Sequence, residues 1–130
     1  MKTPMDHVTD AELTVMKALW ERGTSTIREL TSDLYPGGGA SHYATVQKLL
    51  DRLEAKSCVR HRPRGRVNVY TASRARQDLI AHRLRETADK LCEGSLTPLL
   101  TQLVGSARLS KDQLAELRKL VDRMERSRED

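Results

Sequence analysis

The chain reads Val59-Arg-His-Arg-Pro-Arg-Gly-Arg-Val-Asn-Val-Tyr70 shortly after a helix-patterned stretch, residues 41–56. Alternation of apolar with basic or polar residues on both sides of Pro63-Arg-Gly65 predicts two strands joined by a turn, with Pro63 second and Gly65 fourth in the turn. Residues 41–76 hold nine Lys and Arg against two acids, a net charge of +7 in a chain whose net charge is +5. Positive charge focused on one helix and one hairpin is the electrostatic footprint of a protein that binds a polyanion.

The stretch before the hairpin has the periodicity of a helix from about His42 to Lys56, with Ser41 as its expected cap. Its apolar residues share one face: Val46, Leu49, Leu50 and Leu53. The opposite face is rich in hydrogen-bonding groups: His42, Thr45, Gln47, Lys48 and Arg52. Gln can bond adenine bidentately, Lys can reach the acceptors of guanine, and Thr can offer its methyl group to thymine. This face therefore has the chemistry to read base edges.

Two shorter helices are predicted before this one. The capping-box patterns Thr9-Asp-Ala-Glu12 and Thr26-Ile-Arg-Glu29 mark their starts. Their apolar stripes are Leu13, Met16, Leu19 and Trp20 in the first, and Ile27, Leu30 and Leu34 in the second. Gly23 ends the first helix, and the run from Pro36 to Gly39 breaks the chain before the third. Helix, helix, breaker, helix and basic hairpin is the order of a winged helix-turn-helix.

The remaining residues, 73–130, predict three amphipathic helices without a sheet to pack on. Their apolar residues are Ile80, Leu84, Ala88 and Leu91; then Leu99, Leu100, Leu103 and Val104 after Thr97-Pro98; then Leu114, Leu117, Leu120, Val121 and Met124 after a capping box at Ser110–Gln113. So short a tail cannot bury three apolar stripes by itself, so we expect a second copy of the chain to cover them. The expected fold is mainly α with a small β-hairpin wing: a winged-helix DNA-binding domain, residues 1–72, and a helical dimerisation domain, residues 73–130.

Composition excludes several other classes of protein. The chain has no Phe, one Trp and three Tyr, too few aromatic platforms for a protein that stacks single-stranded bases, so duplex DNA is the favoured partner. An enzyme is not expected, because Gly37-Gly-Gly39 lacks the Lys-Ser/Thr of a phosphate-binding loop, and metalloprotease and nucleophile-elbow patterns are absent. No cofactor is expected. The N-terminus has no apolar signal segment, and no run of eighteen apolar residues occurs, which favours a cytoplasmic protein without membrane insertion.

The two cysteines, Cys58 and Cys92, are expected to be small core residues. Cys58 and His61 lie three apart, so on one strand they point to opposite faces and cannot share a metal ion unless the strand begins after Cys58. We therefore predict no metal site, and a redox or metal role for either cysteine stays open. His7, His42 and His82 are expected at the surface or an interface, with a DNA phosphate contact open for His42.

Four stretches of the chain resemble the penicillinase-repressor family, the BlaI/MecI/CopY type: residues 9–20, residues 45–53, the hairpin to Tyr70, and residues 109–117. The similarity runs from about Val8 to Met124. It implies a transcriptional repressor that binds a dyad operator as a homodimer through a winged helix, with the helical tail as the dimerisation module. By position, the residues implied to read bases are Ala44, Thr45, Gln47 and Lys48, and those implied to contact the DNA backbone are Ser41, His42, Tyr43, Arg52, Arg62, Arg64 and Arg66.

The resemblance also bears on how repression is relieved. In the antibiotic-responsive members a membrane sensor protease, or a process that it triggers, cuts an Asn-Phe bond in the tail, and the aligned bond here is Gln102–Leu103. The tail ends Arg126-Ser-Arg-Glu-Asp130 and lacks the Cys-x-Cys motifs of the copper-responsive members. The family ends its third helix with Gly, whereas Ser57 stands here. We expect relief by proteolysis or destabilisation of the tail; the alternatives are a ligand- or metal-gated regulator and an adaptor that docks its basic hairpin on an acidic protein.

Overall fold

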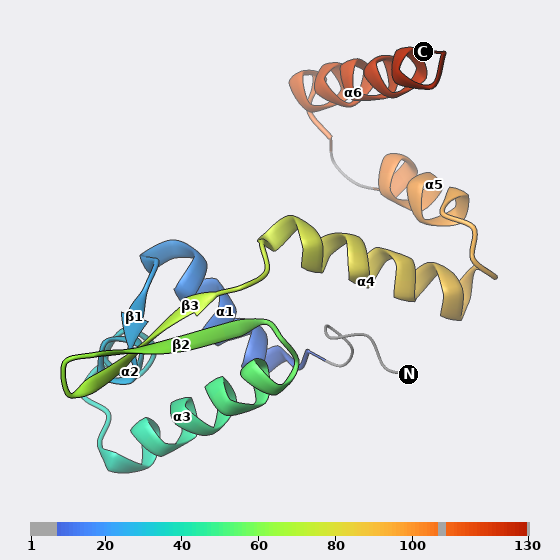
Figure 1. Ribbon diagram of the computed structural model, residues 1–130. Helices are drawn as coiled ribbons and strands as arrows, with labels where there is room; N and C mark the ends of the chain where they lie inside the picture. The colour runs from blue at the N-terminus through green and yellow to red at the C-terminus, as the bar shows by residue number, and fades with distance from the viewer. Residues whose placement is uncertain (1–7, 107–108, 130) are drawn as a thin grey trace. The chain divides into compact units, whose positions relative to one another are not determined.

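The computed structural model describes residues 8–106 and 109–129 of the chain. Its helices are α1 (Asp10–Arg22), α2 (Ile27–Leu34), α3 (Ala40–Ala55), α4 (Arg76–Leu91), α5 (Thr97–Ser106) and α6 (Lys111–Glu129), and its strands are β1 (Ser25–Thr26), β2 (Val59–Arg64) and β3 (Val67–Ala72) (Figure 1). They form two compact units, Met1–Arg83 and Leu84–Asp130, so the division falls within α4. The predicted fold class, a mainly helical chain with a β-hairpin wing, is confirmed. The functional domains 1–72 and 73–130 stay a prediction.

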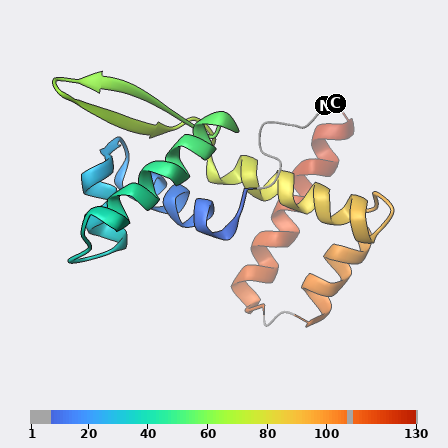
Figure 2. The ribbon, with the colours of Figure 1, turned by 90° about the horizontal axis from the view of Figure 1, so that it is seen from below.

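The first unit is built on α1, α2 and α3, which pack together beside the hairpin (Figure 2). Both predicted capping boxes form, with Thr9 and Thr26 each exchanging hydrogen bonds with the glutamate three residues on. The core is aliphatic, and its largest fully buried apolar side chains are Val15, Met16, Leu19, Leu30, Val46, Leu50, Leu53 and Val59. Leu13 and Trp20, expected on the buried face of α1, are only half-buried at the edge of this core. Val15 is buried in their place, as is the charged Glu12.

The hairpin is part of a three-stranded antiparallel sheet of order β1-β3-β2, because Ser25 and Thr26 pair with Tyr70 and Val69. The sequence did not predict β1. The turn was also predicted wrongly: Pro63 lies within β2 opposite Asn68, and the loop is only Gly65-Arg66 between the paired residues Arg64 and Val67. A two-residue hairpin loop needs a positive φ at its first residue, and Gly65 supplies it with a φ of 66°. β2 is an edge strand, where the missing N–H of proline is tolerated.

The two ends of α3 differ from the prediction in opposite ways. The helix begins at Ala40 after Gly39, which makes no side-chain cap hydrogen bond, so Ser41 is not the cap. At the other end the left-handed cap forms although no glycine is present: Ser57 has a φ of 62°. The N–H of Cys58 donates to the Leu53 carbonyl at 2.8 Å, and that of Ser57 to the Glu54 carbonyl at 3.0 Å. These two bonds make a Schellman motif.

Ser57→Gly is expected to stabilise the first unit by about 1 kcal/mol, because an L-residue in the left-handed region costs roughly 1–2 kcal/mol that glycine avoids. Urea unfolding followed by Trp20 fluorescence measures this. Ser57→Ala is the control, since alanine keeps the Cβ atom and should bring no gain. An equal gain from both substitutions would show that the strain is not in the backbone.

α4 begins at Arg76, three residues after Ser73, where the sequence predicts its start. The indole Nε1 of Trp20 donates to the Arg74 carbonyl at 2.8 Å, which holds the segment before the helix, and the Asp78 carboxylate accepts from the Ala75 N–H at 3.2 Å. Leu79, on the first turn of α4, is buried in the core of the first unit. α4 therefore begins as part of the first unit, beyond residue 72, where the predicted DNA-binding domain ends.

The second unit holds the end of α4 with α5 and α6. The predicted capping box at the start of α6 forms, with Ser110 and Gln113 exchanging bonds of 2.9 and 3.1 Å. α5 begins at Thr97, one residue earlier than expected. Of the two cysteines predicted to be core residues, Cys58 is buried, whereas Cys92 is only half-buried. No residue of α6 is buried. None of the helices in the described part of the chain is both long and apolar enough to span a membrane.

Candidate nucleic-acid interface

α3 separates its side chains as its periodicity predicts. Val46, Leu49, Leu50 and Leu53 are buried, and the four residues expected to read bases are all exposed: Ala44, Thr45, Gln47 and Lys48. Thr45 already has a partner, because its hydroxyl donates to the Ser41 carbonyl at 3.0 Å. Of these four residues, Gln47 and Lys48 present the longest polar side chains to a ligand.

The first turn of α3 holds the three residues expected on the DNA backbone, Ser41, His42 and Tyr43. Ser41 is exposed, and Tyr43 is exposed by 41%. His42 is half-buried, with its ring centroid 4.6 Å from that of Tyr35 and its Nδ1 buried without a hydrogen-bond partner. His42 therefore packs against the turn before α3, which leaves Ser41 and Tyr43 as the better placed of the three.

A cavity of about 500 Å³ lies between α2 and the start of α3. Its lining residues are Arg28, Thr31, Ser32, Gly38, Gly39, Ala40 and Tyr43. Because Gly39 gives no side-chain cap, N–H groups of the first turn of α3 stay open to a ligand, beside one guanidinium and one serine hydroxyl. Such a set suits a phosphate group. Arg28 and Ser32 were not predicted from the sequence. The only indication of their role there was their position on α2, the helix before the Pro36–Gly39 break.

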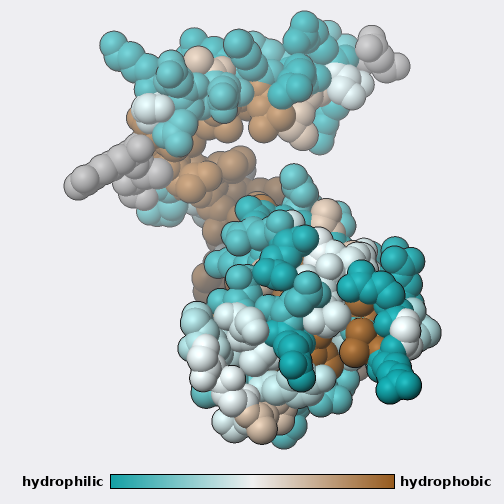
Figure 3. Space-filling view, turned by 90° about the vertical axis from the view of Figure 1, so that its left-hand side faces the viewer, coloured by the Kyte–Doolittle hydropathy of each residue, from teal (hydrophilic) through white to brown (hydrophobic). Residues whose placement is uncertain are grey.

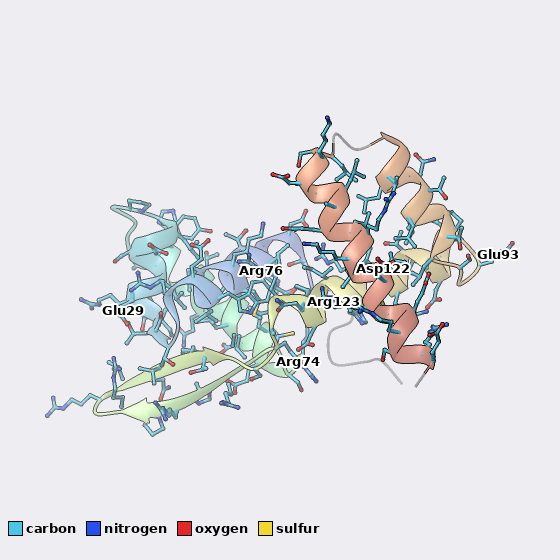
Figure 4. All side chains as sticks on the ribbon, turned by 90° about the horizontal axis from the view of Figure 1, so that it is seen from above. Glu29, Arg74, Arg76, Glu93, Asp122 and Arg123 are labelled. Carbon is cyan, nitrogen blue, oxygen red and sulfur yellow. The ribbon has the colours of Figure 1, made fainter. Side chains whose placement is uncertain are left out.

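The wing carries its cations at the exposed end of the hairpin, where Figure 4 shows side chains projecting beyond the helices. Arg62 and Arg64 lie in β2 and Arg66 in the loop, and all three are exposed. Alternation along β2 places Arg60, Arg62 and Arg64 on one face of the strand. Among the described residues no ion pair engages these arginines, Lys48 or Arg52, so their charges are available to phosphates.

The other face of β2 ties the wing to α3. The Nδ1 of His61 lies 2.5 Å from the Glu54 carboxylate, and the His61 ring centroid lies 5.4 Å from that of Tyr70. Burial raises the pKa of the Tyr70 hydroxyl, and the nearby carboxylates of Asp51 and Glu54 raise it further. His61 therefore orients the hairpin relative to α3. Cys58 lies just before β2, and among the described residues no three His, Cys, Asp or Glu side chains form a metal-binding group.

A buried ion pair fixes the far end of α3 to α1. The Nζ of Lys56 donates to the two carboxylate oxygens of Glu12 at 2.6 and 2.8 Å, and the Glu12 side chain has no exposed surface. Burial by itself raises the pKa of Glu12, but hydrogen bonds from Lys56 and Thr9 outweigh it and hold this pKa below its ordinary value. The sequence predicted Glu12 only as a capping residue. The ion pair with Lys56 gives Glu12 a second role, which is to hold α1 to the far end of α3.

The chain is similar to known proteins over most of its length. A family model described as penicillinase repressor matches residues 8–123. The penicillinase repressor of Bacillus licheniformis is 28% identical over 116 residues, which cover 89% of this chain and 90% of that protein. A solved structure, described as the solution structure of the DNA binding domain of the repressor BlaI, is 30% identical, with a TM-score of 0.49, and the match covers 59% of this chain and 93% of that one.

Proposed function

The chain belongs to the penicillinase repressor family of DNA-binding regulators, as the sequence resemblance predicted. From this premise we propose that it represses transcription as a homodimer on a pseudo-palindromic duplex operator. The observation that carries the proposal is the exposed polar face of α3 beside a wing of exposed arginines. A helix of this kind fits the major groove, where base pairs are told apart, and the wing fits the phosphate backbone. The family consists of regulators, not enzymes.

Roles within the interface follow from this proposal. Ala44, Thr45, Gln47 and Lys48 face base edges, while Ser41, Tyr43, Arg52 and the wing arginines hold phosphates. Arg28 and Ser32, at the cavity before α3, join the second group. His42 remains in the phosphate-binding group only indirectly, because its ring packs against Tyr35 and shapes the turn before α3.

Substitutions in the base-reading group and in the phosphate-binding group are expected to have different effects on DNA binding. Gln47→Ala should cost about 1–3 kcal/mol on the operator and little on random duplex, because it removes a hydrogen-bonding group from the base-reading face. Arg64→Ala with Arg66→Ala should weaken binding to both and flatten the log-log salt dependence by about one unit for each phosphate that is no longer neutralised. Titrations of labelled operator and random duplex at several salt concentrations measure both effects.

Matched losses on operator and random duplex for Gln47→Ala would remove it from the base-reading group. The same titrations decide the adaptor alternative. An adaptor that docks its basic hairpin on an acidic protein would bind duplex weakly and without sequence preference.

Dimerisation is proposed from the surface of the second unit. Its helices leave large apolar side chains exposed by 44% to 79%: Leu84, Leu91, Leu100, Leu103, Val104, Leu114, Leu120, Val121 and Met124. Ile80, on the first unit's part of α4, is exposed to a similar degree, and Leu99 and Leu117 are partly buried. Figure 3 shows brown, apolar atoms gathered on this unit between hydrophilic ones. Monomeric soluble proteins rarely leave so much apolar surface in water, so a second copy is the occupant that we propose.

Relief of repression is proposed to act on α5. Gln102 and Leu103, the bond aligned with the cleaved bond of the family, are both exposed in the middle of this short helix. A protease cuts extended chain, so α5 must open locally first, which a helix with few buried side chains does at low cost. A membrane sensor protease, or a process that it triggers, is the proposed partner. A ligand- or metal-gated regulator remains the alternative.

Cleavage at Gln102–Leu103 is expected to give two fragments in protein recovered from its own cells after cell-wall stress. Intact-mass analysis before and after stress measures this. Fragment masses that match residues 1–102 and 103–130 identify this bond. Full-length protein under fully induced conditions would contradict proteolytic relief and leave gating by a ligand or metal.

A further inference from the structure

A second hollow lies in the first unit, between α1 and the first turns of α4. Its volume is about 190 Å³, and its lining residues are Leu13, Lys17, Trp20, Arg76, Leu79, Ile80 and Arg83. Its apolar walls come from Leu13, Trp20, Leu79 and Ile80. None of its residues belongs to the face of α3, to the wing or to the cavity before α3. Ile80 also belongs to the proposed dimerisation surface, and the DNA-binding proposal gives the rest of this groove no task.

Three cations surround the apolar walls. The Arg76 guanidinium, labelled in Figure 4, lies 5.3 Å from the centre of the Trp20 ring, and Arg83 donates to the Val8 carbonyl at 2.6 Å. Lys17 is exposed on α1. Within residues 8–106 and 109–129, no carboxylate forms an ion pair with any of the three. Like charges gathered without a counter-ion attract an anion, and the apolar walls between them favour one with an apolar body.

We propose that this groove binds a small apolar carboxylate. The apolar part packs on Leu13, Trp20 and Leu79, and the carboxylate lies at Lys17 and Arg76. The size of the groove favours a small molecule over a protein, because a stable protein interface buries about 800 Å² on each partner from 20–30 residues a side. Binding here does not depend on operator binding. It would give the ligand-gated alternative a site on the helix that runs from the first unit into the second.

The chain contains one tryptophan, Trp20, so its fluorescence reports this groove directly. Titration of the full-length protein with octanoate is expected to give a saturable change in Trp20 emission, matched by heat in calorimetry. Acetate, which has the charge without the apolar body, and octanol, which has the body without the charge, should each bind at least about tenfold more weakly.

Lys17→Gln with Arg76→Gln should weaken octanoate binding by about tenfold or more, because both groups that hold the carboxylate lose their charge. Arg118→Gln with Lys119→Gln removes the same charge from exposed positions of α6 and should leave octanoate binding unchanged. Calorimetry is the deciding readout for the first variant, since losing Arg76 also changes the surroundings of Trp20.

Three results would overturn the proposal. The first is no saturable octanoate binding, the second is octanol binding as tight as octanoate, and the third is an equal loss in the control variant. Emission that depends on protein concentration without ligand, and that octanoate leaves unchanged, would instead show a second copy in the groove. None of these results changes the outcome of the operator titrations, so the groove proposal and the DNA-binding proposal are tested independently.

Discussion

Leu117→Lys with Leu120→Lys is expected to lower the apparent affinity of the full-length protein for its operator by about 10²–10⁴-fold. Both side chains belong to the apolar stripe of α6, where no residue is buried within the protomer. Two charges on this stripe oppose packing against a second copy without disturbing the core of the first unit. Once the two DNA-binding units separate, joint binding becomes two weak and independent events.

Ala115→Lys with Asp122→Asn is the matched control. It changes the net charge by the same amount on the opposite face of α6, so electrostatic attraction to DNA is altered equally while the stripe is kept. Sedimentation gives the oligomeric state, and operator titration at fixed salt gives the affinity. Footprints of the wild type should show two half-sites on one face of the duplex, about 10–10.5 base pairs apart or a multiple of this. A monomeric variant that still binds the operator with full affinity would contradict the proposed role of the tail.

Local signals in the sequence predicted the starts of three helices well. Thr9, Thr26 and Ser110 start helices because their side chains bond the backbone three residues on, and that partner is visible in the sequence. The faces of α3 follow from a period of 3.6 residues. The ends of α3 were less predictable. Gly39 gives no side chain to recognise as a cap, and Ser57 takes a left-handed conformation that glycine favours.

Long-range pairing was what the sequence could not predict. β1 is two residues long and exists only because Ser25 and Thr26 meet β3 more than forty residues later. The hairpin loop was misplaced because Pro63 and Gly65 both favour turns, and the register that places Pro63 in β2 is set by pairing with β3. In the candidate site, the exposed face of α3 was predicted from periodicity. The contact between His61 and Glu54, and the packing of His42 on Tyr35, needed the fold.

Lys56→Met is expected to destabilise the first unit by about 3 kcal/mol. Removing one partner of a buried ion pair costs about 3–5 kcal/mol, because the remaining charge is left in a poorly solvating site. The lower end applies, since the Lys56 side chain is 24% exposed whereas that of Glu12 is fully buried. Urea unfolding followed by Trp20 emission measures the loss in this unit. Arg22→Met is the control: Arg22 pairs with Glu29 at 3.6 Å on the surface of the same unit, and such pairs contribute about 0–1 kcal/mol.

The pH dependence separates the loss of a charge partner from a change in packing. In the wild type the pKa of Glu12 is lowered, so its contribution to stability is present above the unfolded pKa and is lost as the pH falls through the folded pKa. Without Lys56 the burial of Glu12 is less compensated, so its folded pKa rises and it takes up a proton sooner as the pH falls. The deficit of Lys56→Met should therefore narrow from neutral pH into the acid range. Glu12→Gln added to Lys56→Met should recover most of the loss, because glutamine keeps the bond to the Thr9 N–H and carries no charge. A loss of stability in Lys56→Met that is constant with pH and is not restored by Glu12→Gln would show that Lys56 acts through packing alone.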